Sequence, residues 1–142
     1  RKLWSLSYPS AKFPKKVLSK ADEFPMTNKK RLIGDSGEDL VVKYLEENSY
    51  QILERNYLKP YGEIDIIALK GQVLSFVEVK TRKDDSIAQA SEAVDYYKQQ
   101  RLIRAAEAYI KENKLGDYFM SFDVCEVYRA SGKINYIENA FG

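Results

Sequence analysis

The 142 residues of this chain suffice for one domain with its own hydrophobic core. Hydrophobic residues make up 44% and charged residues 31%, which excludes wholesale disorder, and no apolar run approaches the roughly 20 residues of a membrane-spanning helix. The net charge of +2 is uneven, because residues 1–30 carry eight basic and two acidic residues (+6), which leaves −4 on residues 31–142.

Histidine is absent, and Cys125 is the only cysteine. These counts exclude Ser-His-Asp and Cys-His catalysis, Cys/His zinc sites and an internal disulfide. Cys125 lies in the apolar run FDVCEV, so we predict a buried structural thiol rather than a nucleophile. We expect a cytoplasmic protein whose catalysis, if any, uses carboxylates, lysine or a metal.

The segment over residues 1–30 interleaves lysines with aromatic residues and three prolines. Such a composition can hold phosphates and stack bases, but it is more often a flexible extension, which we predict here. Met26, in MTNKK, resembles a natural start of translation, which leaves open that residues 1–25 are a non-native extension. The folded domain is expected over residues 31–142.

Seven secondary-structure elements are predicted in this domain from apolar spacing and turn residues. In chain order they are a helix over 35–48, strands over 50–58, 63–69 and 73–80, a helical segment over 86–113, and strands over 118–129 and 133–139. The second helical segment is one long helix or two, and it ends at Gly116. The order αβββαββ predicts an α/β fold with a mixed sheet flanked by helices.

Apolar side chains at helical spacing mark the core-facing sides of both helical segments. Val41 and Leu45 lie one turn apart in the first segment. Tyr44, Tyr97 and Tyr109 also recur at core spacing, so we expect them to be buried rather than to bind nucleic acid.

The predicted hairpin over 62–82 places acidic residues among β-branched and aromatic neighbours, and its register decides how they meet. One register, with a two-residue turn, puts Glu63 opposite Glu78. A second, in which Ala68 pairs with Ser75 round a longer loop, puts Asp65 opposite Glu78. A three-residue turn would put Asp65 and Glu78 on opposite faces, because side chains alternate along a strand.

Either same-face register gathers two or three carboxylates beside the ammonium of Lys80. Carboxylates so near to each other raise one another's pKa unless a positive charge lies between them. An all-oxygen site of this kind favours Mg²⁺ or Mn²⁺ over softer metals. The alternative is an ordinary ion pair between Glu78 and Lys80 on a solvated face of the sheet.

Three short motifs carry a family resemblance: GE at 37–38, GEID at 62–65 and FVEVKTR at 76–82. With them, residues 31–142 resemble the YraN-like family of the PD-(D/E)XK nuclease superfamily, whose fold is restriction-endonuclease-like and Holliday junction resolvase-like. Ile64 stands where the superfamily motif has proline. Further matching positions are Tyr44, Leu45, Arg55, Asn56, Ala93, Val94, Lys98, Phe122, Asp123, Asn139, Ala140 and Phe141.

The resemblance implies a metal site and a reaction. Asp65, Glu78 and the main-chain carbonyl of Val79 would hold Mg²⁺ or Mn²⁺, and Lys80 would orient or deprotonate the attacking water. Glu38 would join the metal site, as a helical Glu does in Holliday junction resolvases, although it also has the spacing of a capping box that begins at Asp35.

Three charged residues near this site are expected to contact the substrate: Glu63, Arg82 and Lys98. The implied function is a metal-dependent endonuclease that hydrolyses phosphodiester bonds in DNA, including branched or damaged DNA. The alternative is a nucleic-acid-binding module without turnover on the same scaffold. Partners would be DNA and either a second copy of the chain or another protein, with no membrane.

Overall fold

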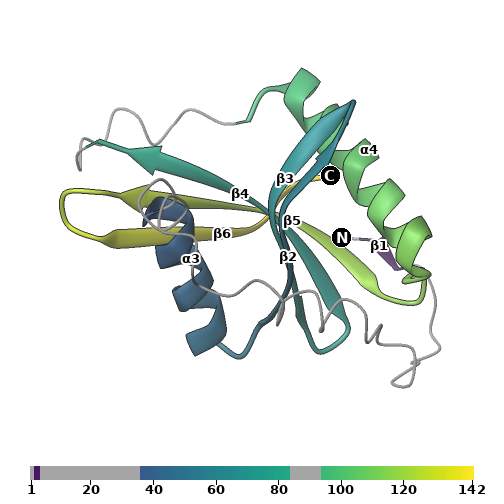
Figure 1. Ribbon diagram of the computed structural model, residues 1–142, viewed down its shortest axis with the longest axis horizontal. Coiled ribbons are helices and arrows are strands. Elements are labelled where there is room, and N and C mark those ends of the chain that lie inside the picture. The colour runs from purple at the N-terminus through teal and green to yellow at the C-terminus, as the bar shows by residue number, and fades with distance from the viewer. Residues whose placement is uncertain (1, 4–35, 84–93) are drawn as a thin grey trace.

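The computed structural model describes residues 2–3, 36–83 and 94–142 (Figure 1). Its elements in chain order are β1 (Lys2–Leu3), α3 (Ser36–Glu47), β2 (Gln51–Lys59), β3 (Gly62–Lys70), β4 (Val73–Arg82), α4 (Tyr96–Asn113), β5 (Phe119–Tyr128) and β6 (Lys133–Phe141). The α/β fold and the order αβββαββ from α3 onward are confirmed. In the described part of the chain, no helix is long and apolar enough to cross a membrane.

The strands form one mixed sheet in the order β2, β3, β4, β5, with β1 and β6 both pairing with β5. Only the β4–β5 pair is parallel among the strand pairs described. Nearly every side chain of β5 is buried, as expected for a central strand covered on both faces. Of the two strands that carry the predicted site, β4 pairs with this buried strand and β3 pairs with β4.

The two described helices lie on opposite sides of the sheet (Figure 1). Val41 and Leu45 of α3 pack on one face, in a cluster with Val77 of β4 and Cys125 of β5. On the other face, α4 packs against a cluster that includes Phe76 of β4. Adjacent residues of β4 thus contact different helices, so the alternation of a strand divides its side chains between two cores.

Helix α4 contributes buried side chains at helical steps: Leu102, Ala105, Ala106, Tyr109 and Ile110. Tyr109 is buried as predicted, but the prediction for Tyr97 is wrong, because 74% of that residue is exposed. The helix begins at Tyr96, so Tyr97 lies in its first turn, ahead of the buried stripe.

The end of α4 at Asn113 agrees with the predicted range, but the residue that terminates the helix differs from the predicted Gly116. The helix ends at Asn113, and Lys114 is its C-cap with φ 54° and ψ 49°, a left-handed conformation usually taken by glycine. The next residue, Leu115, is buried and donates its N–H to the carbonyl of Ile110. This buried anchor closes the helix two residues before Gly116.

Several predictions fall on residues outside the described ranges. They concern residues 4–30 of the predicted extension, the capping residue Asp35, and residues 86–93 of the helical segment predicted over 86–113. Lys2 and Leu3 form the short strand β1, which pairs antiparallel with Phe119 and Met120, where no strand was predicted.

The buried polar side chains of β5 are satisfied. Asp123 accepts hydrogen bonds from Ser121 Oγ at 2.7 Å, from the Tyr136 hydroxyl at 2.5 Å and from the N–H of Asn139 at 2.9 Å. Cys125 is fully buried, as predicted, and burial followed by the charges of nearby carboxylates raises its pKa to about 12. Its thiol is therefore a core group.

Candidate active site

The register of the β3–β4 hairpin brings Asp65 and Glu78 together. Ala68 pairs with Ser75, as in the second predicted register, and the recorded pairs run on to Ile66 with Val77. The next position in this register sets Asp65 opposite Glu78. The connecting loop is only Gly71 and Gln72, shorter than expected, because β3 continues to Lys70, which pairs with Val73.

Glycine permits this tight connection, since Gly71 has a φ of +61°, in the left-handed region that side chains disfavour. The two strands separate where the acidic pair begins. Instead of a ladder bond to β3, the N–H of Val79 donates to Asp65 Oδ2 at 2.8 Å. In a strand, the N–H and C=O of one residue point to the same neighbour, so the Val79 carbonyl turns to the side of Asp65.

The Asp65 carboxylate is the most perturbed acid of the site. Burial and the charge of Glu78 raise its pKa to about 7, against the hydrogen bond from Val79, which lowers it, and further carboxylates at Glu38 and Glu63 add to the rise. The positive groups of the folded chain therefore do not fully neutralise the carboxylates gathered around Asp65. A bound cation would relieve this repulsion.

Glu78 forms an ion pair with a lysine of helix α4. Its side chain is almost fully buried, and Lys98 Nζ in α4 donates to Glu78 Oε2 at 2.6 Å. Burial lowers the pKa of Lys98, but the nearby carboxylates of Glu78 and Asp65 outweigh it and leave the pKa raised. Lys98 thus joins the site as an ammonium ion beside the acidic pair.

These groups open into a cavity of about 400 Å³ between the end of the β3–β4 hairpin and the start of α4. Its lining residues are Gly62, Glu63, Asp65, Glu78, Asp95, Tyr97, Lys98, Arg101 and Leu102. Four predicted site residues are among them: Asp65, Glu78, Glu63 and Lys98.

One side-chain hydrogen bond and one close backbone approach connect the start of β3 to α4 at the edge of this cavity. Arg101 Nε donates to the carbonyl of Tyr61 at 2.8 Å, and a Cβ on Gly62 would lie 2.8 Å from the carbonyl oxygen of Arg101. Only glycine allows β3 to start this close to α4. The first residue of the GEID motif therefore sets the distance between the acidic pair and the helix.

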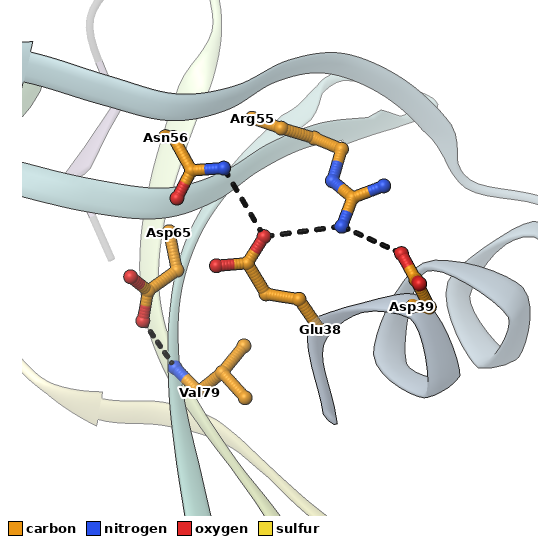
Figure 2. Close-up of polar contacts among 6 residues, drawn as sticks. All are labelled: Glu38, Asp39, Arg55, Asn56, Asp65 and Val79. Carbon is orange, nitrogen blue, oxygen red and sulfur yellow. Dashed lines mark hydrogen bonds and ion pairs between the residues drawn. The ribbon is translucent and has the colours of Figure 1, made fainter. Parts of the chain in front are cut away.

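Glu38 approaches Asp65 from α3. Its Oε1 accepts from Arg55 Nη2 at 3.1 Å and from Asn56 Nδ2 at 3.3 Å, and Arg55 also binds Asp39 at 2.8 Å. Figure 2 shows the Glu38 carboxylate between Arg55 on one side and Asp65 on the other. The charge of Glu38 acts on Asp65, while its assignment as a metal ligand stays a prediction.

The glycine before Glu38 allows this approach. A Cβ on Gly37 would lie 2.8 Å from Thr81 Oγ1, so glycine lets the first turn of α3 reach the end of β4. Thr81 is three residues beyond Glu78 along the same strand. The fold therefore brings four residues that match the family pattern close to the hairpin motifs: Gly37, Glu38, Arg55 and Asn56.

Lys80 and Arg82 lie further along β4, beyond the lining of the cavity. Lys80 shares the face of Glu78 by alternation and is half-buried. Arg82 Nη2 donates to Glu126 Oε2 at 3.0 Å, an ion pair in which both side chains are largely buried. Arg82 thus has a structural partner in β5, and its predicted contact with substrate is untested.

The oxygen atoms of Asp65, Glu78 and Val79 fit a hard divalent cation that is bound by few protein ligands. Within the described residues, no group of three or more His, Cys, Asp or Glu side chains is arranged to hold a metal ion. Asp65 and Glu78 offer two carboxylates, and Val79 offers a carbonyl on the same side. Mg²⁺ is commonly bound by one or two carboxylates together with water and substrate phosphate, so this smaller set suits it.

Sequence reasoning missed two features of the site. It assigned Tyr97 to the core, although the side chain lines the cavity. It also assigned no role to Asp95, which caps α4 by accepting from the N–H of Lys98 at 2.8 Å. An Asp directly before the first helical residue is a capping signal, but no sequence signal places the first turn of α4 over the hairpin.

Comparisons with known proteins agree on one family. The model of the uncharacterised protein family UPF0102 matches residues 37–127. A UPF0102 protein of Alkaliphilus metalliredigens is 48% identical over 110 residues, which cover 77% of this chain and 96% of that protein. A UPF0102 protein of Dictyoglomus thermophilum is 44% identical over 120 residues, covering 82% of this chain and 100% of that protein. The chain therefore belongs to the uncharacterised protein family UPF0102.

Proposed function

We propose that this protein is a metal-dependent endonuclease that hydrolyses phosphodiester bonds in DNA. The observation that carries the proposal is the pairing of Asp65 with Glu78 in one open cavity, where burial and mutual repulsion raise the pKa of Asp65 to about 7. Two adjacent carboxylates that repel each other in a cavity are unfavourable for folding alone. Such strain is typical of sites that bind a cation or perform catalysis.

The ligands of a cation in this site would be the carboxylates of Asp65 and Glu78 and the main-chain carbonyl of Val79. Mg²⁺ or Mn²⁺ bound there would lower the pKa of water and neutralise charge on phosphate oxygens. The hydrogen bond from the Val79 N–H fixes the Asp65 carboxylate in position before any ligand arrives. A preformed orientation of this kind reduces the reorganisation that binding requires.

Two lysines, Lys98 and Lys80, would have separate roles beside these carboxylates. Lys98 donates to Glu78 at 2.6 Å and orients that carboxylate within the cavity. Lys80 lies one alternation step from Glu78 on the same face, where its amine would orient or deprotonate the attacking water and offset charge on the phosphate. The reaction would then depend on positioning and charge, in a chain without histidine.

A second candidate is a nucleic-acid-binding module without turnover. Two observations favour it: Glu78 already has an ammonium partner, and among the described residues no three His, Cys, Asp or Glu side chains are arranged to hold a metal ion. Such a protein would bind DNA in a salt-dependent manner but leave it intact. A cleavage assay with matched binding measurements therefore separates the two candidates.

The test is cleavage of a labelled panel that contains single-stranded, duplex, flap and four-way-junction DNA, with Mg²⁺ or Mn²⁺. Wild type is compared with Asp65→Asn and with Lys80→Ala. Each substitution is expected to lower the cleavage rate by roughly a hundredfold or more, the range for loss of a catalytic or electrostatic group.

Lys133→Ala is the matched control, because Lys133 is an exposed lysine at the start of β6, away from the cavity lining. It should cleave as wild type does. Equal cleavage by wild type, Asp65→Asn and Lys80→Ala would point to a contaminating nuclease and reject the proposal. Binding without cleavage on every substrate would select the second candidate.

A further inference from the structure

Two adjacent tyrosines are exposed where α4 begins. Tyr96 is 73% exposed and Tyr97 is 74% exposed, although large aromatic side chains are usually at least half-buried. Only Tyr97 of the two lines the cavity that holds Asp65 and Glu78. Tyr97 therefore lies at the rim of the candidate active site, and Tyr96 does not line it.

The first turn of α4 holds Tyr97 in a defined place. Asp95 caps the helix through the N–H of Lys98, and the side chain of Lys98 is held by Glu78. One turn further on, Arg101 binds the carbonyl of Tyr61. The backbone that carries Tyr97 is thus anchored on both sides, so the tyrosine needs little ordering when it meets a ligand.

The charge of the cavity limits what can bind there. Its lining contains four carboxylates, Glu63, Asp65, Glu78 and Asp95, and two cations, Lys98 and Arg101, for a formal charge of −2. A divalent cation brings this charge only to zero. Phosphate attraction, which supplies most non-specific affinity for duplex DNA, is therefore weak at this site.

We propose that Tyr97 stacks on an unpaired base of DNA, next to the phosphate that enters the cavity. This inference rests on the proposed function for the position of that phosphate. Stacking on an aromatic ring does not depend on charge and requires a base whose face is open. The bases of an intact duplex stack on one another, so the substrate class is DNA with an unpaired nucleotide at the cleavage position, such as a single strand or a flap.

The charges flanking Tyr97 favour DNA over an apolar protein partner. Lys98 and Arg101 also line the cavity and lie one and four residues beyond Tyr97 along α4. Cations beside an exposed aromatic side chain are the combination found in proteins that bind single strands, where the backbone follows the cations and the base stacks.

The experiment measures binding of a single-stranded oligonucleotide that contains 2-aminopurine, whose fluorescence is quenched when the base stacks. It is performed in the Asp65→Asn protein, so that cleavage does not deplete the ligand. Adding Tyr97→Leu should weaken binding roughly ten- to a hundredfold, the range for loss of one base–aromatic stack, and should remove the quenching. Adding Tyr97→Phe should restore both.

Tyr96→Leu is the matched control, because it removes an equally exposed tyrosine from the neighbouring position outside the cavity. Its binding should equal that of the parent. Circular dichroism melting of each variant checks that the fold is unchanged. Equal losses from Tyr96→Leu and Tyr97→Leu, or no loss from either, would overturn the proposal, as would tighter binding of blunt duplex than of single strands.

The two proposals fail separately. Binding that depends on Tyr97, with no cleavage by wild type in Mg²⁺ or Mn²⁺, would reject hydrolysis and support stacking. Cleavage that depends on Asp65, with binding unaffected by Tyr97→Leu, would support hydrolysis and overturn stacking.

Discussion

Asp65 should destabilise the metal-free protein as the pH rises, and Asp65→Asn should remove this effect. Burial, followed by the charge of Glu78, raises the pKa of Asp65 from its ordinary 3.8 to about 7. Because the folded-state value lies above the unfolded one, the folded protein holds the proton more tightly between these two values. The free energy of unfolding therefore falls as pH rises from about 4 to about 7, and stays low above that.

The size of the effect follows from the shift. One pKa unit corresponds to about 1.4 kcal/mol, so a shift of about three units gives at most about 4 kcal/mol. The cavity is open to water on one side, so we expect about half, roughly 2 kcal/mol at about pH 8. Asparagine keeps an oxygen that accepts from the Val79 N–H but carries no charge. Asp65→Asn should then be more stable than wild type by that amount, or about 5 °C in melting temperature.

The assay is urea denaturation in the presence of a chelator, at about pH 5 and about pH 8, with the difference between wild type and Asp65→Asn as the readout. The difference should grow with pH. Glu107→Gln, on the exposed side of α4, is the control and should show no such trend. A difference that is unchanged by pH, or an Asp65→Asn protein that is less stable at the higher pH, would refute the reasoning.

Mg²⁺ should reverse the destabilisation. A cation that binds only the folded state raises the melting temperature by mass action and relieves the repulsion between Asp65 and Glu78. The rise should be larger at the higher pH, where Asp65 has lost its proton, and absent in Asp65→Asn. An equal rise in both proteins would show that the cation binds elsewhere.

Two further substitutions test how the fold positions the site. Gly62→Ala should lower the free energy of unfolding by about 1–3 kcal/mol, because the added Cβ would lie 2.8 Å from the carbonyl oxygen of Arg101. Gly116→Ala is the control: its Cβ would enter open space, so the free energy of unfolding should change by less than about 0.5 kcal/mol. Tyr136→Phe should lower it by about 1–3 kcal/mol in urea denaturation, since buried Asp123 loses a hydroxyl donor; no change would show that the bond contributes little.

Local patterns in the chain were sufficient to predict the existence and type of the elements from α3 onward, but not the short strand β1. The β-branched residues of EIDIIAL and VLSFVEVK and the glycine between them predicted β3 and β4, and helical apolar spacing predicted the buried stripe of α4 through Leu102 and Tyr109. The strand prediction succeeds because β-branched side chains suit a pleated sheet, and the helix prediction because the apolar period matches that of the helix. The same reasoning failed for Tyr97, because spacing says nothing of where the sheet beneath the helix ends.

The sequence by itself determined which groups could react: two carboxylates and a lysine on adjacent strands of a chain without histidine. Only the tertiary structure decided how they meet. The hairpin register depends on one residue of loop length, and shifting it by one would send Asp65 to the other face. The contacts of Glu78 with Lys98 and of Glu38 with Arg55 join segments 20 and 17 residues apart. Such contacts follow from the packing of α4 and α3 on opposite faces of the sheet, which no local pattern encodes.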